Sequence, residues 1–268
     1  MKPALLALSL LLSVNQEVTA RNPEWVKLDQ ELIRAVNALV NQKPAVVQQY
    51  FAKGLEGTHH LGFGWKSKDF AASGGYMTIK ARCYYYHDTL VSYTIAPWLP
   101  TENAVKDLYV NQFSAVFKPT PGQVRPYHYN PASLQKALGS YRPSYPLATT
   151  PATIADYMSP ESGLEYGYSG GEAPVVLPNR RAFILLQDQL STADIVLLMH
   201  AVNPASRLTA IEYYLKNKKR FTHAEQQSLN QWVKVVFKEL PKVESLQGCI
   251  GGLYNARELV ARFTKTTL

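Results

Sequence analysis

The sequence predicts an α+β fold, with an N-terminal helix, a small antiparallel sheet and an all-helical C-terminal subdomain. Three observations support this class. Apolar residues recur at helical spacing in residues 25–40, apolar and polar residues alternate in residues 76–86, and helix-capping motifs recur after residue 190. The chain lacks the regular alternation of strands and helices that a parallel sheet requires, so a doubly wound fold is not expected.

The first twenty residues have the layout of a cleavable secretory signal peptide. Lys2 supplies a positive charge, residues 4–14 form an apolar run rich in Leu and Ala, and small or β-branched residues lead to Ala20. This run is much shorter than the roughly 20 residues that cross a bilayer. We therefore expect a secreted or periplasmic protein, cleaved near Ala20, with no transmembrane segment in the mature chain.

The mature chain is expected to begin with a helix and to continue into strands. Asn22 and Pro23 are a capping residue followed by a proline at the first helical position, and an apolar stripe runs on to about Val40. A short second helix is predicted over residues 45–53, and one strand over residues 61–65.

Residues 76–86 and 89–96 predict a β-hairpin at the centre of the sheet. In its first strand one face is apolar and the other carries aromatic and basic residues. A three-residue loop at residues 87–89 is expected, because this register places the apolar residues of the returning strand beside the apolar face. The apolar face consists of Met77, Ile79, Ala81, Cys83 and Tyr85.

Three regions follow one another after the signal peptide. Residues 21–118 form the α+β subdomain, and residues 119–180 are a loop-rich segment with many Pro, Gly and Tyr residues. Thirteen of the seventeen tyrosines fall in residues 76–168, and disordered linkers are poor in aromatic residues, so we expect this segment to be ordered. Residues 181–268 predict a helical subdomain. Its capping boxes begin at Ser191 and Thr222.

The two cysteines of an exported chain suggest one disulfide. A bond between Cys83 and Cys249 would join the N-terminal half of the chain to its C-terminal end. It would stabilise the fold by roughly 4–5 kcal/mol at most, because it closes a long loop. Two separately buried thiols are the alternative.

Catalytic motifs occur, but without the context that their chemistry requires. Ser169 lies in a G-x-S-x-G pattern that lacks a buried strand before it and a helix after it. Ser133 and Lys136 fit S-x-x-K, but no K-T-G element follows. The six histidines show no metal-binding helix signature, and no phosphate-binding glycine loop occurs. The sequence therefore predicts no cofactor and no metal site, and it favours a protein that is not an enzyme.

The aromatic and basic face of the predicted hairpin is the remaining candidate site. Such residues are enriched in binding surfaces, although neighbouring segments could instead cover this face and bury its tyrosines. The face consists of Trp65, Lys80, Arg82, Tyr84 and Tyr86.

We therefore expect a non-enzymatic protein of the bacterial envelope that binds a protein or glycan. A bacterial source is favoured because none of the twelve asparagines lies in an Asn-x-Ser/Thr glycosylation site. The net charge of +8 is not gathered in one long run, and no specific nucleic-acid partner is expected. Two alternatives remain: a secreted hydrolase with scattered catalytic residues, and an assembly factor that docks through its C-terminal helices.

Overall fold

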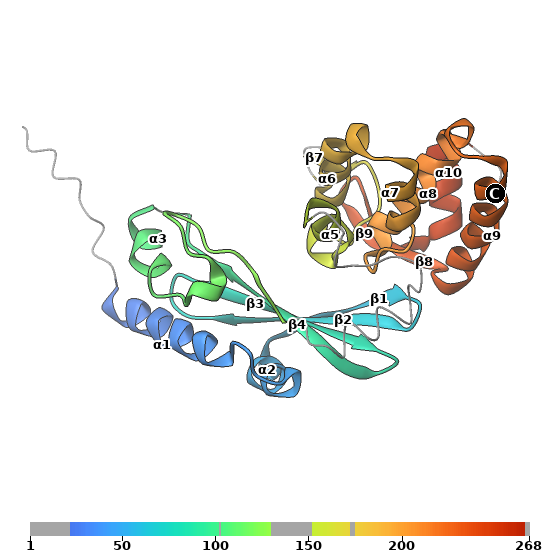
Figure 1. The fold of residues 1–268 in the computed structure, drawn as a ribbon. Coiled ribbons are helices and arrows are strands. Elements are labelled where there is room, and N and C mark those ends of the chain that lie inside the picture. The colour runs from blue at the N-terminus through green and yellow to red at the C-terminus, as the bar shows by residue number, and fades with distance from the viewer. Residues whose placement is uncertain (1–21, 102, 130–151, 172–174, 266–268) are drawn as a thin grey trace, which may run out of the picture. The chain divides into compact units, whose positions relative to one another are not determined.

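The computed structural model describes residues 22–101, 103–129, 152–171 and 175–265 (Figure 1). In these residues the fold is α+β, as predicted: an N-terminal helix precedes a five-stranded antiparallel sheet, and helices dominate the C-terminal part. The expected signal peptide and the Ser133 and Lys136 pair lie outside the described residues.

Two compact units make up the described chain. The first takes in residues 22–40, 71–80 and 96–127. The second takes in residues 41–70 and 81–95 and the chain from residue 128 onward. The helical C-terminal part therefore belongs to the same unit as the first strands of the sheet.

The main sheet has the strand order β1-β2-β3-β4-β5, so each strand pairs with its neighbour in sequence. Two further sheets, β6–β7 and β8–β9, have two strands each, and the sequence did not predict them. The strands are β1 Leu55–Gly62, β2 Trp65–Ser73, β3 Thr78–Tyr86, β4 Thr89–Trp98, β5 Tyr127–Tyr129, β6 Ser169–Gly170, β7 Val175–Val176, β8 Lys242–Gln247 and β9 Ile250–Asn255.

Helices occur in both units, and most of them follow the sheet. None of the described helices has the length and apolar character needed to cross a membrane. The α-helices are α1 Pro23–Leu39, α2 Pro44–Phe51, α3 Asn103–Val110, α5 Ala152–Met158, α6 Pro178–Leu186, α7 Thr192–Leu198, α8 Pro204–Lys216, α9 His223–Glu239 and α10 Ala256–Thr264. Short 3₁₀ helices are η1 Ala52–Gly54, η2 Ala115–Phe117, η4 Pro160–Ser162, η5 Gln187–Gln189 and η6 Lys218–Arg220.

The predicted helix caps are confirmed. The Asn22 side chain accepts a hydrogen bond from the Glu24 amide at the start of α1. Ser191 and Thr222 begin complete capping boxes at α7 and α9, in which the side chain and backbone bonds are reciprocal. These ends are set by residues close in sequence, which is why the sequence predicts them.

A buried carboxylate organises the first unit. Asp29 of α1 accepts hydrogen bonds from the backbone amides of Gly75 (2.8 Å), Tyr76 (2.9 Å) and Met77 (3.2 Å). The Tyr109 hydroxyl donates a further bond at 2.7 Å. Because the buried carboxylate is fully engaged, it holds the turn between β2 and β3 against α1.

The turn between β3 and β4 corrects the expected register. It has two residues, His87 and Asp88, and not the predicted three. Both have positive φ (43° and 64°), as short hairpins with the twist of the sheet require. Val91 consequently packs with Tyr84 in one apolar cluster. Residues 91–95 are all buried, so both faces of the strand are covered here. Matching the apolar residues of the two strands on one face therefore could not identify the register.

Residues 61–65, predicted as a strand, instead contain the turn between β1 and β2. Phe63 and Gly64, which lie between β1 and β2, have positive φ (55° and 75°), which is incompatible with extended backbone. The Phe63 ring stacks on Trp232 with centroids 5.3 Å apart, and the Arg207 guanidinium lies 4.6 Å from its centroid. The apolar character of this segment therefore reflects a turn whose Phe63 side chain packs against the helical core.

The cysteines do not form the predicted disulfide. Both are free: Cys83 is buried in β3, whereas Cys249 is exposed between β8 and β9. Burial raises the pKa of Cys83 to about 12. The prediction was wrong because two cysteines can form a disulfide only where the fold brings their Cα atoms close together. The number of cysteines in a sequence does not reveal that distance.

Candidate functional site

The structure does not leave the predicted aromatic and basic residues as one open face. Trp65 and Tyr84 are only 3% and 9% exposed, and the Trp65 ring packs on Tyr86 with centroids 4.9 Å apart. Lys80 is exposed and belongs to the first unit, where its ammonium lies 4.6 Å from the centre of the Trp98 ring. The alternation in β3 identified the two faces, but it carried no information on what covers them.

Arg82 belongs to a charged cluster that the sequence did not predict. Its guanidinium donates to both carboxylate oxygens of Asp69 on β2, each at 2.7 Å, in a bidentate arrangement. A second carboxylate, Glu161 of η4, lies 3.5 Å away and accepts a hydrogen bond from the Tyr84 hydroxyl. His59 of β1 and Glu244 of β8 complete this group, which we call the His59 cluster. Its members are His59, Asp69, Arg82, Tyr84, Glu161 and Glu244.

His59 lies between two carboxylates. Its Nδ1 is 2.5 Å from Glu244 of β8, and its Nε2 is 3.5 Å from Asp69. The hydrogen bonds with Asp69 and Glu244 raise the pKa of His59 to about 9. Burial alone would raise the pKa of Asp69, but the hydrogen bonds from Arg82 and His59 hold it well below its ordinary value. The imidazole is therefore a cation at neutral pH.

The chemistry of the His59 cluster is that of an ion-pair network. General base catalysis needs a neutral imidazole beside a nucleophile, and His59 is charged. Within the described residues no hydroxyl or thiol is hydrogen-bonded to its ring. The cluster instead connects β1, β2 and β3 with η4 and β8 inside the second unit.

A second charged cluster, the Glu212 cluster, lies among the C-terminal helices. Glu212 of α8 accepts hydrogen bonds from Arg180 (2.6 Å), Lys216 (2.7 Å) and Tyr166 (3.0 Å), and also from Tyr168. Burial alone would raise the pKa of Glu212, but pairing with Arg180 lowers it below its ordinary value. Burial raises the pKa of Tyr166 well above 10. These groups are engaged with one another, as in a structural ion pair.

The sequence candidates for nucleophiles gain no support from the described residues. Ser169 is exposed in β6 and pairs with Val176 of β7. A nucleophile elbow requires a sharp turn from a buried strand into a helix, and this short ladder does not provide one. Among all the residues that the structure describes, no group of three or more His, Cys, Asp or Glu side chains could hold a metal ion.

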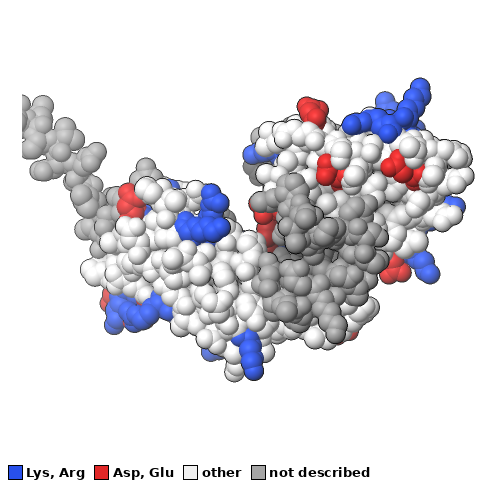
Figure 2. Space-filling view, in the orientation of Figure 1, with Lys and Arg blue, Asp and Glu red and all other residues white. Residues whose placement is uncertain are grey.

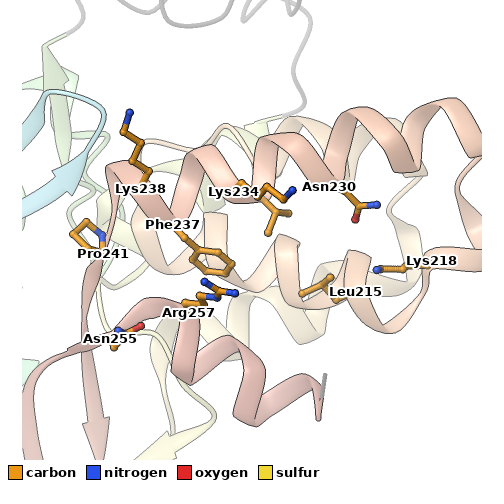
Figure 3. A pocket seen from close by; sticks show the side chains of 10 residues that line it. Leu215, Lys218, Asn230, Lys234, Phe237, Lys238, Pro241, Asn255 and Arg257 are labelled. Carbon is orange, nitrogen blue, oxygen red and sulfur yellow. The ribbon is translucent and has the colours of Figure 1, made fainter. Parts of the chain in front are cut away.

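A cationic groove lies among the C-terminal helices (Figure 3). It has a volume of about 740 Å³, and one wall is a single face of α9. The opposite side comes from the end of α8, from η6 and from the start of α10. Its lining residues are Leu215, Lys218, Asn230, Val233, Lys234, Phe237, Lys238, Pro241, Asn255 and Arg257.

Four of the lining residues of the cationic groove are Lys or Arg, and none is Asp or Glu. Lys234, Lys238 and Arg257 are exposed, and Lys218 is half-buried over the Tyr214 ring. Figure 2 shows Lys and Arg side chains gathered over the C-terminal helices, at the upper right of the view. The sequence did not predict this site, although the basic residues at 216–220 and the four-residue spacing of Lys234 and Lys238 were visible signals.

No family model, curated protein or solved structure matches this chain. The function is therefore inferred from the sites themselves. Of these, the two charged clusters are satisfied internally, whereas the cationic groove has exposed lysines at Lys234 and Lys238 and no carboxylate in its described lining.

Proposed function

We propose that the protein is a non-enzymatic binding protein of the bacterial envelope, exported by its N-terminal signal, with an anionic protein segment or glycan as its partner. The observation that carries this proposal is the cationic groove, whose described lining contains four cations and no carboxylate. A concave surface of one charge sign concentrates ligands of the opposite sign. The net charge of +8 acts in the same direction.

The cationic groove replaces the hairpin face as the proposed binding site. On that face Arg82 is neutralised by Asp69 and Glu161, while Trp65 and Tyr84 are largely buried. A partner would have to break these contacts before it could use them. In the cationic groove, by contrast, three of the four cations are already exposed.

The spacing of the lysines on α9 supports a ligand role. Lys234 and Lys238 are four residues apart on one helix face, where two like charges destabilise a helix by about 0.2–0.5 kcal/mol. An anionic partner removes this repulsion on binding. A groove built only for stability would be expected to place a carboxylate at one of the two positions.

Charge reversal in the groove tests the proposal. We expect the double variant Lys234→Glu/Lys238→Glu to lose about tenfold or more in co-sedimentation with a bacterial envelope fraction at low salt, because it inverts one wall of the groove. The wild-type protein should itself be released as the salt concentration rises.

A matched control makes the same change of charge elsewhere. Lys43 and Lys53 are exposed near the ends of α2 and η1, and the variant Lys43→Glu/Lys53→Glu should co-sediment nearly as the wild type does. Equal losses in both double variants would mean that net charge and not the groove governs binding. Undiminished binding of the groove variant would refute the proposal.

The proposed export has its own measurement. The protein recovered from outside the cytoplasm should begin at or close to Arg21, as N-terminal sequencing would show. A full-length protein confined to the cytoplasm would contradict this part of the proposal.

A further inference from the structure

The floor of the cationic groove is apolar. Val233 belongs to the hydrophobic core of the second unit, and Leu215 and Phe237 are partly buried against that core. Pro241 extends the floor beyond the end of α9. Because core packing fixes these side chains, the groove offers a preformed apolar strip to a ligand.

Basic side chains stand on both sides of this apolar strip. Lys234 and Lys238 come from α9, whereas Lys218 and Arg257 come from η6 and α10 opposite (Figure 3). A ligand that fits both features has an apolar stripe with negative charges along each edge. An amphipathic helix rich in Glu and Asp has this pattern.

The length of the groove suits a short helix. Asn230 and Lys238 are eight residues apart on α9, which corresponds to about 12 Å along the helix axis. With Pro241 beyond, the strip accommodates roughly two to three turns of a helical ligand.

We infer that the cationic groove binds an acidic amphipathic helix of a partner protein. This inference rests on the proposed function and chooses between its two partner classes. Apolar residues of the helix would lie on Val233 and Phe237, and its carboxylates would face the lysines and Arg257. Insertion of an amphipathic helix into an apolar groove is a recurring mode of recognition between proteins.

The polar groups of the groove favour a protein segment over a glycan. A glycan presents many hydroxyl groups, so its recognition depends on hydrogen-bonding side chains that are available to it. The two amides of the lining are already used as acceptors: Asn230 Oδ1 accepts from the Tyr214 hydroxyl (2.9 Å), and Asn255 Oδ1 accepts from the Glu258 amide (3.1 Å).

Three probes of similar charge test the inference with the whole protein. The first is a fluorescent peptide of about fourteen residues with leucines at helical spacing and glutamates on both sides of the stripe. The second has the same composition, with the leucines moved so that no stripe forms. The third is an oligomer of galacturonic acid. We expect the striped peptide to bind about tenfold more tightly than its isomer and than the uronate, as measured by fluorescence anisotropy and competition.

The Lys234→Glu/Lys238→Glu variant should weaken binding of the striped peptide by about tenfold or more, with circular dichroism showing an unchanged fold. Equal affinity for the two peptides, or tighter binding of the uronate, would overturn the helix inference. In that event, loss of envelope co-sedimentation by the same variant would still uphold the proposed function. Retained co-sedimentation would instead refute the proposed function.

Discussion

The Glu212 cluster and the His59 cluster both pair an arginine with carboxylate and tyrosine side chains, but they differ in exposure. Glu212 and Arg180 have side chains only 3% and 6% exposed, whereas His59 and Glu244 are 22% and 29% exposed. Water can hydrate a charge left unpaired in the His59 cluster, but it does not reach the centre of the Glu212 cluster. The comparison predicts that the contribution of an ion pair to stability depends on its burial more than on the number of charges.

The largest expected effect is in the Glu212 cluster. Glu212→Ala leaves the Arg180 guanidinium buried without its partner, so we expect it to lower the free energy of unfolding by about 3–5 kcal/mol. Urea unfolding measures this change. The double variant Glu212→Leu/Arg180→Met removes both charges and should recover much of the loss. A single-variant loss below 1 kcal/mol would show that the burial of this pair does not decide its weight.

The corresponding change in the His59 cluster should be milder. Asp69→Asn removes the bidentate partner of Arg82, but Glu161 stays nearby and water has access. We expect a loss of about 1–2 kcal/mol in the same unfolding measurement. A loss as large as that of Glu212→Ala would remove the distinction between the two clusters.

The pH dependence of the free energy of unfolding should reveal the stabilising contribution of His59. The pKa of His59 is near 6.5 when unfolded and about 9 when folded, so its proton stabilises the fold fully below pH 6.5. This contribution, on the order of 2 kcal/mol, should disappear as the pH rises from 6.5 to about 9. His59→Gln should show a correspondingly smaller decline over that range. Parallel stability curves for the two proteins would contradict the assignment.

The smallest effect is expected at a fully solvated pair. Lys27 and Glu31 of α1 are 4.0 Å apart, with side chains 77% and 50% exposed. Lys27→Ala should change the free energy of unfolding by less than about 0.5 kcal/mol. This variant gives the baseline for the two clusters, and a larger loss would point to an unrecognised contact of Lys27.

Local features of the fold were predictable from the sequence. The caps at Asn22, Ser191 and Thr222 bond to backbone amides two or three residues away, so neighbouring residues determine where α1, α7 and α9 begin. The apolar face of β3 was also predictable, because alternation is a property of one strand. The α+β class follows from these local patterns taken together.

The register of the main hairpin, the state of the cysteines and the candidate sites depend on contacts between distant parts of the chain. The turn at His87 and Asp88 set the register of the hairpin. Because residues on both faces of the sheet are buried there, the alternation of apolar and polar residues does not favour one register over the other. His59 and Glu244 meet across 185 residues of sequence, and no local pattern encodes such a distance. The cationic groove likewise combines α8, η6, α9 and α10. Its basic residues are visible in the sequence, but their convergence on one apolar strip depends on how the helices pack.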